Sequence, residues 1–215
     1  MLHHLGQHSS ILTSYVSEIR SLEIQQDPLR FRTNLERIAE VLCYELSKCI
    51  PSIRQDVRTP LGTAQLEVPA EDPVLVTILR AGLAMHQGVL RCFDRADSAF
   101  VSAYRKHNSP EDFDIQVEYL AAPSLDQRTW VISDPMLATG SSMVAVYKAL
   151  LKIGTPTQVH IVSAIATPQA IAFVQSQLPT NTQIWVAAID PELTAQSYIV
   201  PGLGDAGDLA YGIKR

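Results

Sequence analysis

The sequence is poor in cysteine, and this excludes the classes of protein that disulfide bonds or cysteine-bound metals hold together. Only three of its 215 residues are cysteines: Cys43, Cys49 and Cys92. Their number is odd, and all three lie in otherwise apolar, periodic segments, which is typical of reduced thiols in a core. We therefore expect a protein of the cytoplasm.

Long apolar runs and an excess of positive charge are also lacking. No run approaches the roughly 20 apolar residues of a membrane-spanning helix, and the opening MLHHLGQHSS has neither the basic nor the apolar region of a signal peptide. A net charge of −5 gives no electrostatic basis for binding nucleic acid. The sequence therefore predicts no membrane and no nucleic-acid partner, and any anion must be bound by a local group of donors.

What the chain has is a hydrophobic fraction of 47%, enough at this length for one sizeable core. Short apolar runs alternate with stretches of helical periodicity, which is typical of an α/β domain with a mostly parallel sheet and helices on both faces. The expected strands are Val74–Leu79, Ala99–Tyr104, Trp130–Ile132, Val159–Ser163 and Ile184–Ile189. The expected helices are Leu35–Cys49, Leu83–Leu90, Met143–Leu151 and Pro168–Gln177.

The first 32 residues are weakly periodic, and we interpret residues 1–32 as an N-terminal extension without a role. The segment contains three histidines, His3, His4 and His8. They could form a metal-binding tract, but a solvated terminus is the simpler interpretation. Thr33 and Glu36 then form a capping box, which predicts the start of the first long helix.

Two further segments interrupt the alternation of strands and helices. Prolines and a glycine at 51–72 predict a loop with at most one short strand near 64–68. Residues 99–120 contain two alternating runs around strong turn residues, which predicts a projecting hairpin arm. With a tail at 190–215, the chain is expected to be one domain over residues 1–215.

The chain is organised around residues 129–154, which read as a strand, a loop and a helix in that order. Such a loop directs its backbone N–H groups and the positive end of the helix dipole to one point, which favours a bound phosphate. The alternative is an ordinary connection of an α/β domain, because Thr-Gly-Ser-Ser suits any tight turn and any helix start. Spacing alone leaves both interpretations open.

Four charged residues fall just beyond predicted strands: Arg80, Arg105, Asp134 and Asp190. Because parallel strands end at the same edge of a sheet, where ligands of this fold class bind, we expect several of them to meet there. Arg80 could instead form a structural salt bridge, and Arg105 could belong to a solvated hairpin face. Asp134 lies too far before its helix to be preferred as a capping residue.

The tail contains a sequence that fits the dinucleotide-binding pattern G-x-G-x-x-G, from Gly202 to Gly207. That motif must follow a strand and open a helix, with an acid about 20 residues later, whereas here Pro201 precedes it and only eight residues follow Gly207. The glycines indicate either a backbone that closely approaches a ligand or a tight C-terminal loop. A P-loop motif is also absent, so the sequence gives no support for ATP hydrolysis.

Together, these stretches resemble the uracil phosphoribosyltransferases of the type I phosphoribosyltransferase fold, in their order and approximate spacing. The matching segments are ILRAGLAM at 78–85, AYR at 103–105, DPMLATGSS at 134–142 and YIVPGLGDAGD at 198–208. The resemblance implies a Rossmann-like, mostly parallel sheet with a projecting hairpin and a small base-binding hood formed by the tail. It also implies an enzyme of pyrimidine salvage, which transfers ribose 5-phosphate from phosphoribosyl pyrophosphate (PRPP) to uracil, giving UMP and pyrophosphate.

The resemblance implies a role for each matching residue. Asp134, Arg105 and Asp205 are the expected catalytic residues. The residues expected to bind PRPP are Arg80, Arg105, Asp134, Pro135, Met136, Leu137, Ala138, Thr139, Gly140, Ser141, Ser142 and Asp205. The residues expected to bind uracil, mainly through the main chain, are Ile199, Gly204, Asp205 and Ala206. Mg²⁺ is expected to be bound mainly through PRPP, with no metal ligands of the protein's own.

The chain departs from the family's pattern at four positions. Ser141, Ala84 and Ser197 stand where glycine is usual, and Leu209 stands where a basic residue is common. Ser197 and Leu209 flank the expected base loop, so two other functions stay open: a phosphoribosyltransferase for another base, or a weak relative that binds PRPP or UMP in regulation. A homodimer or higher homo-oligomer through the hairpin arm is expected. A strained loop is expected at Arg80, with a cis peptide on one side of that residue.

Overall fold

The computed structural model describes residues 1–107 and 113–214, and side chains within residues 1–103 and 117–214. In this part of the chain, eight strands form one sheet in the order β1-β10-β9-β7-β4-β5-β6, with β8 beside β9. All neighbours are parallel except β5 and β6, so the predicted mostly parallel sheet is confirmed. The strands are β1 (Leu2–His4), β4 (Val74–Leu79), β5 (Asp97–His107), β6 (Phe113–Ala121), β7 (Thr129–Ser133), β8 (Met136–Leu137), β9 (Gln158–Ala166) and β10 (Gln183–Ile189).

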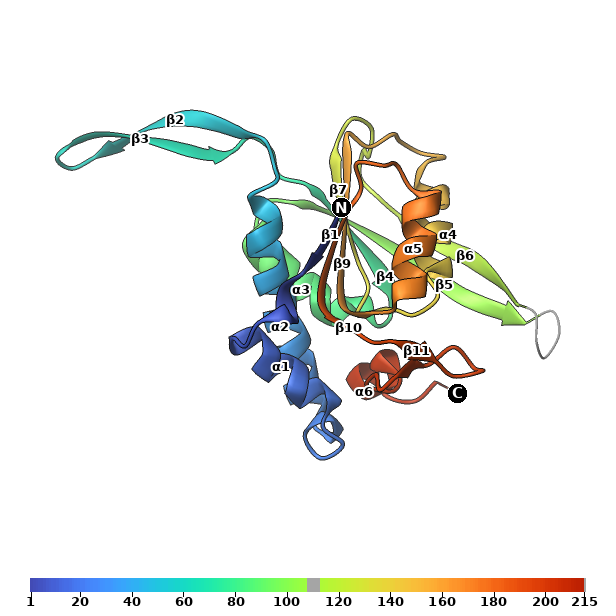
Figure 1. Cartoon of the computed structure of the whole chain (residues 1–215). Coiled ribbons are helices and arrows are strands. Elements are labelled where there is room, and N and C mark those ends of the chain that lie inside the picture. The colour runs from blue at the N-terminus through green and yellow to red at the C-terminus, as the bar shows by residue number, and fades with distance from the viewer. Residues whose placement is uncertain (108–112, 215) are drawn as a thin grey trace.

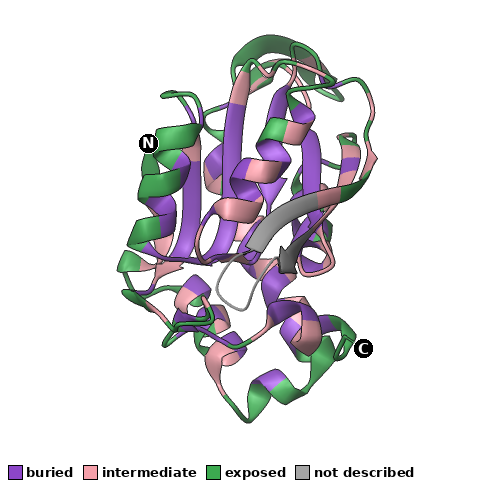
Figure 2. Cartoon of the chain, turned by 90° about the vertical axis from the view of Figure 1, so that its right-hand side faces the viewer, coloured by how far each residue is buried: buried purple, intermediate pink, exposed green. Residues whose placement is uncertain are grey.

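Helices cover both faces of the sheet, as the sequence predicted (Figure 1). Side chains of a strand alternate between the faces, so Leu75 of β4 packs in the cluster that contains α2 and α3, whereas Val74 and Val76 pack with α4 and α5. Figure 2 shows the central strands and the inner faces of these helices as buried. The helices are α1 (Ile11–Arg20), α2 (Pro28–Ser47), α3 (Gly82–Cys92), α4 (Ser141–Leu150), α5 (Pro168–Gln177) and α6 (Ala206–Tyr211), with 3-10 turns η1 (Leu5–Gln7) and η2 (Ile24–Gln26).

Helix α2 begins five residues before Thr33, so the prediction of a capping box at Thr33 is wrong. The N-cap is Asp27, whose Oδ1 accepts hydrogen bonds from the backbone N–H groups of Leu29 and Arg30, at 2.9 and 3.2 Å. Pro28 follows at the first helical position, where its missing N–H costs nothing. An aspartate followed by proline is the stronger start signal, and the weak apolar pattern of the first turn hid it.

The prediction that the cysteines lie in the core is confirmed at one position and wrong at two. Cys43 lies in α2 and is fully buried, where burial raises the pKa of its thiol well above the usual range. Cys49 and Cys92 are exposed, because they lie at and beyond the ends of helices, where the periodic face no longer points inward. In the described residues, no helix is long and apolar enough to cross a membrane.

The N-terminal segment is part of the sheet and not a solvated terminus. Strand β1 pairs with β10, and the ring of His3 stacks on Trp185 with centroids 3.7 Å apart. His3 Nε2 also lies 2.8 Å from Oε1 of Gln183. The prediction failed because a three-residue edge strand is held by backbone hydrogen bonds, which leave no hydrophobic pattern in the sequence.

Residues 51–72 form a long hairpin, so the predicted loop is wrong. β2 (Ser52–Thr59) and β3 (Gly62–Pro69) pair antiparallel over eight positions and project from the body (Figure 1). Both faces are largely exposed, so neither strand has the alternation that marks a half-buried strand. The hairpin that the sequence predicted at 99–120 is confirmed as β5–β6, and its expected turn at 108–112 lies outside the described residues.

The tail (residues 190–214) follows β10 and packs below the carboxyl ends of the parallel strands (Figure 1). It contains the short hairpin β11 (Glu192–Leu193) and β12 (Ile199–Val200), followed by α6. Its turn places Ser197 at a φ of 63°, in the left-handed region. This conformation explains why glycine is usual at that position in the family that the sequence resembles.

We expect Ser197→Gly to stabilise the protein slightly. Relief of the left-handed strain, roughly 1–2 kcal/mol, is partly offset by the larger entropy that glycine loses on folding, about 0.5–1 kcal/mol. The thermal midpoint should rise by a few degrees in calorimetry. Gln127→Gly is the matched control, because Gln127 has a φ of 55° in a turn outside the tail and should give a similar rise. A lower midpoint for Ser197→Gly would contradict this account.

A second prediction concerns His160, which lies fully buried in β9. Its Nδ1 accepts a hydrogen bond from Trp185 Nε1 at 3.1 Å, and its Nε2 has no partner among the described residues. Burial lowers the pKa of His160 to about 4, and the nearby His3 adds a smaller lowering. The folded protein therefore holds His160 neutral, whereas the unfolded chain titrates it at the ordinary value.

We expect the free energy of unfolding to fall as the pH drops from about 6.5 toward 4, because the unfolded chain binds the proton more readily. The loss is on the order of 3 kcal/mol, at about 1.4 kcal/mol for each unit of pKa difference. Urea unfolding of the protein and of His160→Gln across this pH range measures it. The variant should lose less stability on acidification, and identical pH dependence in both proteins would exclude His160 as the cause.

Candidate active site

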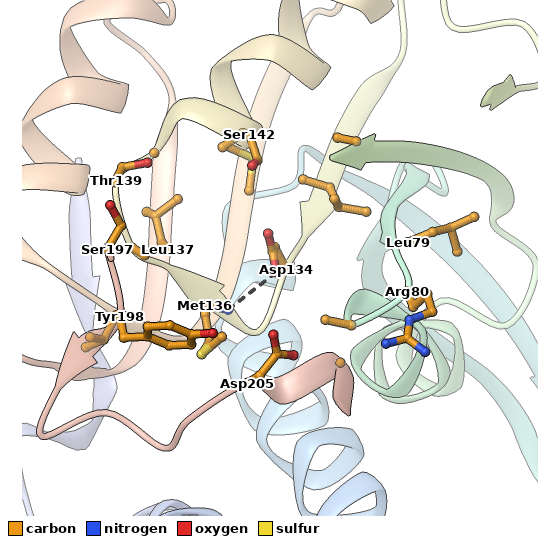
Figure 3. Close-up of a pocket in the computed structure, with 18 of the residues that line it drawn as sticks. Leu79, Arg80, Asp134, Met136, Leu137, Thr139, Ser142, Ser197, Tyr198 and Asp205 are labelled. Carbon is orange, nitrogen blue, oxygen red and sulfur yellow. Dashed lines mark hydrogen bonds between the residues drawn. The ribbon is translucent and has the colours of Figure 1, made fainter. Parts of the chain in front are cut away.

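A cavity of about 490 Å³ opens between the carboxyl ends of the central strands and the tail (Figure 3). Three segments supply most of its wall: the loop after β4, the loop between β7 and α4, and the tail. Its lining residues are Ile78, Leu79, Arg80, Ala81, Ala103, Asp134, Met136, Leu137, Ala138, Thr139, Gly140, Ser142, Met143, Gln196, Ser197, Tyr198, Ile199, Asp205, Gly207 and Lys214. Of the four charged residues expected to meet at this edge, Arg80 and Asp134 line the cavity.

Asp134 comes directly after the fully buried strand β7, and its carboxylate points into the cavity (Figure 3). Its backbone N–H donates to the carbonyl of Val162 in β9, at 3.1 Å, which fixes the residue to the sheet. Among the described residues, the carboxylate accepts one long hydrogen bond, 3.4 Å, from the N–H of Met136. Burial raises the pKa of Asp134 to about 7, and this hydrogen bond opposes the shift.

The loop after Asp134 is held against β9 by a ladder of backbone hydrogen bonds. The carbonyls of Pro135 and Leu137 accept from the N–H groups of Ile165 and Thr167, and the Thr167 hydroxyl donates to the carbonyl of Ala138 at 2.8 Å. This ladder takes up the carbonyls on the sheet side of the loop. Residues 136–140 and Ser142 line the cavity, whereas Pro135 and Ser141 do not appear in its wall.

Gly140 ends this loop and precedes the first residue of α4. Its φ is 80°, and a Cβ there would approach the carbonyl oxygen of Ala170 at 3.1 Å and a methyl of Val174 at 3.0 Å. Only glycine fits both the conformation and this close approach to α5. The turn directs the start of α4 at the cavity, where the first N–H groups of a helix lack intrahelical partners and attract anions.

The hydroxyl groups of Thr139 and Ser141 form hydrogen bonds within the turn before α4. The Thr139 hydroxyl donates to Ser141 Oγ at 3.1 Å and accepts from the Ser141 N–H at 3.3 Å. Ser141 therefore serves the turn in place of the usual glycine without strain, because it has no positive φ. Ala84, the other departure upstream, is buried in α3 and needs no glycine either.

Arg80 follows β4, and its guanidinium is engaged with the tail. Nη2 donates to Oδ1 of Asp208 at 2.9 Å, and Nη1 donates to the carbonyl of Gly212 at 3.1 Å. Nε is buried and has no hydrogen-bond partner among the residues that the structure describes. The alternative of a structural salt bridge is thus correct for the free protein, although Arg80 also lines the cavity. The Leu79–Arg80 peptide bond is cis, as expected from the sequence.

Arg105 lies in β5, opposite Ile115 of β6. Its side chain lies outside the described part of the structure, so its predicted role stays a prediction. Asp190 does not meet the other charged residues, because it is buried in an ion pair with Arg20 and does not line the cavity. Sequence position alone could not distinguish this structural aspartate from Asp134, since both directly follow a buried strand.

The tail forms the opposite wall of the cavity. Asp205 is the N-cap of α6 and points into the same space as Asp134 (Figure 3), while its Oδ1 accepts from the N–H of Asp208 at 2.9 Å. Ile199 and Asp205 line the cavity, whereas Gly204 and Ala206 flank Asp205 outside the wall. Gly204 has a φ of 96°, which favours glycine. Leu209 packs against the hydrophobic core and not into the cavity.

Sequence reasoning missed several residues of the wall. Tyr198 is about half exposed and extends its ring over the cavity toward Met136 (Figure 3). Gln196, Gly207 and Lys214 also belong to the wall. Tyr198 and Gly207 lie within the segment that carries the family resemblance, which is the one signal that could have identified them. Gln196 and Lys214 carry no such signal.

The cavity has the donor set for an anion, but not for a metal ion held by protein ligands alone. Among the described residues, no group of three histidine, cysteine, aspartate or glutamate side chains could hold a metal. Two carboxylates face the cavity, those of Asp134 and Asp205. One or two carboxylates together with substrate phosphates are the usual ligands of Mg²⁺ in such sites. The residues therefore fit an ion that arrives with a phosphate ligand.

Comparison with known proteins agrees with this geometry. The sequence model of the family "Uracil phosphoribosyltransferase" matches residues 7–213. The uracil phosphoribosyltransferase of Porphyromonas gingivalis is 54% identical over 211 residues, which cover 98% of this chain and 98% of that protein. That of Pyrobaculum arsenaticum is 41% identical over 186 residues, covering 85% and 87%.

Solved structures place the fold in the same group. The AQ2163 protein from Aquifex aeolicus has a TM-score of 0.87 and 30% identity, with 99% of both chains covered. Orotate phosphoribosyltransferase of Mycobacterium tuberculosis shares the fold alone, with a TM-score of 0.54 at 9% identity over 87% of this chain and 94% of that one. The expected type I phosphoribosyltransferase fold is confirmed, and the chain belongs to the uracil phosphoribosyltransferase family.

Proposed function

We propose that the chain transfers the 5-phosphoribosyl group of PRPP to uracil. N1 of uracil forms a bond to C1′ of the ribose while the bond from C1′ to the pyrophosphate oxygen breaks. N1 loses its proton, and the products are UMP and pyrophosphate. The observation that carries this proposal is the cavity of about 490 Å³, in which the partly buried Asp134 and the start of α4 face the tail. Membership of the family supports the choice of uracil.

The loop from Pro135 to Ser142 would bind the 5′-phosphate. The carbonyls on one side of this loop are occupied by β9, which leaves N–H groups of the turn and of the first turn of α4 for the anion. The hydroxyls of Thr139 and Ser142 add donors. In the free protein, Thr139 donates to Ser141, so a phosphate oxygen would replace one internal acceptor.

Asp134 would accept hydrogen bonds from the ribose 2′- and 3′-hydroxyls. Its carboxylate accepts one long hydrogen bond from the described residues, and a carboxylate can accept several, so its oxygens have capacity for the ribose hydroxyls. Fixing both hydroxyls orients C1′ toward the base, which is the contribution that positioning makes to such a displacement. The developing positive charge on the ribose would also be stabilised by the nearby carboxylate.

Arg80 and Arg105 would bind the pyrophosphate and stabilise its negative charge as it leaves. For Arg80 this requires exchange, because Asp208 and Gly212 hold its guanidinium in the free protein. The unpartnered Nε of Arg80 supports an anion as an additional acceptor. Mg²⁺ supplies further neutralisation of the pyrophosphate when it is bound, and Asp134 and Asp205 are the residues that would hold it.

The tail would select the base. Uracil presents an acceptor, a donor and an acceptor along O2, N3–H and O4, whereas cytosine reverses the last two. Main-chain groups at Ile199, Gly204 and Ala206 would match the pattern of uracil and leave buried groups unpaired with cytosine. Asp205 would contact both the base side and the PRPP side, in keeping with its place in the wall. Leu209 lies in the core and does not argue against this selection.

The decisive experiment is formation of UMP from uracil and PRPP with Mg²⁺, with cytosine, hypoxanthine and orotate as competing bases. Formation of UMP from uracil, with no nucleotide formed from the other bases, supports the proposal. Transfer to another base instead would support the second possibility left open by the sequence. Tight binding of PRPP or UMP by calorimetry without any product would indicate a regulatory relative.

We also propose that residues 1–215 act as one domain that forms a homo-oligomer. The β2–β3 hairpin supports this, because an isolated two-stranded hairpin is marginal in water. It exposes Ile53 and Leu66 by about half and Leu61 completely. A second copy of the chain that packs on this hairpin would bury these side chains. The hairpin expected at 99–120 is joined to the sheet over much of its length, so β2–β3 is the better candidate for the contact.

We expect affinity for PRPP to rise with pH through the range around 7. The pKa of Asp134 is raised, so its carboxyl group is largely protonated below about 7 and ionised above it. The ionised form accepts the ribose hydroxyls, so KM for PRPP should fall roughly tenfold between about pH 6 and pH 8, following the ionised fraction. Initial rates measured across this range test the prediction.

Asp134→Asn is the matched control for this pH dependence. It keeps the side-chain volume and should lower turnover strongly, while any remaining pH dependence reports titration of PRPP itself. Because the folded state of the free protein prefers the protonated form of Asp134, its stability falls as pH rises from about 4 to 7. The variant should therefore have a higher thermal midpoint at pH 8. Normal turnover in the variant would remove Asp134 from the reaction.

We expect replacement of residues 53–68 by a short Gly-Ser turn to give a monomer with an intact fold. Light scattering measures the mass, and circular dichroism checks the fold. Leu61→Ser at the tip, and Ile53→Ser with Leu66→Ser along the strands, keep the hairpin but lower its apolar area. A parent protein that is itself monomeric at micromolar concentration would refute the oligomer.

A further inference from the structure

The N-terminal segment contacts the tail through charged and polar side chains that the proposed reaction does not use. Arg20, the last residue of α1, donates from Nη1 and Nη2 to Asp190 at 2.8 and 2.7 Å, which is a bidentate pair. Arg20 Nη1 also donates to the carbonyl of Gly202, at 3.0 Å. Asp190 in turn accepts from the N–H of Gly202 at 2.9 Å. Both backbone groups of Gly202 are therefore bound by one ion pair.

Gly202 lies in the tail loop (residues 199–206), at a position that only glycine can occupy. Its φ is 57°, and a Cβ at this position would overlap the carbonyl oxygen of Ile199. Gly202 thus lies directly against the main chain of Ile199, which is buried and lines the cavity. The contacts that hold Gly202 in place therefore also hold the backbone of Ile199, at the wall where the base is proposed to bind.

Two further contacts connect the N-terminal segment with the tail. The buried Gln25 side chain, oriented by its hydrogen-bond partners, donates to the carbonyls of Leu203 and Ile19 at 2.9 and 3.0 Å. Arg32 Nη1 donates to the carbonyl of Ala210 at 2.7 Å. These donors, with Arg20, bind the carbonyls of Gly202, Leu203 and Ala210, three tail residues that do not line the cavity.

We propose that Arg20 is a positioning residue for the base, acting through Asp190 and Gly202 to hold the tail loop in its binding shape. The side chain of Asp190 is only 6% exposed, so its charge requires this partner. A guanidinium supplies two parallel donors and a third to Gly202, a geometry that an ammonium group cannot reproduce. The inference rests on the proposed function for the identity of the ligand, but not for the ordering of the loop.

The first variant is Arg20→Lys, which keeps the charge near Asp190 and loses the bidentate geometry with the contact to Gly202. We expect KM for uracil to rise by roughly 10- to 100-fold, as a small displacement of a positioned group can cause. KM for PRPP should rise much less, since Asp134 and residues 135–142 share no hydrogen bond or ion pair with Arg20 among the described residues, and Asp205 is the one residue of the loop proposed to contact PRPP. Arg20→Met is the stronger variant and should show the same selectivity if it folds.

The matched control is Arg30→Met. Arg30 also forms a bidentate pair in the N-terminal segment, from Nε and Nη2 to Glu18 at 2.6 and 2.8 Å. It has no contact with the tail loop among its hydrogen bonds and ion pairs in the described structure. Both KM values should therefore remain at their parent levels. Thermal midpoints of all variants are recorded to detect a general loss of stability.

A measurement that needs no activity separates this inference from the proposed function. Hydrogen exchange of the free protein should show faster exchange at 199–206 in Arg20→Lys than in the parent or in Arg30→Met. A parent protein that forms no UMP would overturn the proposed function, and the exchange comparison would still decide the role of Arg20. Unchanged exchange together with unchanged KM for uracil would overturn the inference. Equal rises in both KM values would also overturn it, because they indicate a general structural role.

Discussion

The parallel pairing of β7 between β4 and β9 is the constraint on which the rest of the site depends. Ser133, the last residue of β7, lies beside Thr77 of β4 and Val162 of β9. The three strands therefore release their following loops at one edge, where Asp134 meets the loop that carries Arg80. Because all five residues of β7 are buried, this edge cannot shift without disturbing both faces of the core.

The sequence revealed the central sheet and the main loop because both depend on strong local signals. Buried parallel strands are continuous apolar runs, and DPMLATGSS and PGLGDAGD are specific enough to identify a family. β1 and the β2–β3 hairpin were missed for the opposite reason. Backbone hydrogen bonds hold them, and their side chains are polar, exposed or both.

The sequence could not predict which charged residues pair with each other in the free protein. Asp134 and Asp190 each follow a buried strand, but Arg20 neutralises only Asp190. That partner lies 170 residues away and carries no local signal. Arg80 likewise has a carboxylate partner, Asp208, that only the folded tail can supply. Among the described residues, Asp134 has no ion pair of this kind, and burial raises its pKa to about 7.

The pairing of the two chain ends also has a consequence for how the protein is made. The amino group of Met1 donates to the carbonyl of Thr182, and His3 and Arg20 find their partners at Gln183 and Asp190. During synthesis, residues 2–4 leave the ribosome long before residues 183–189, so β1 has no partner until β10 has been made. Contacts of such long sequence separation form late in folding. The tail likewise is not held by Arg20 before Asp190 and Gly202 have emerged.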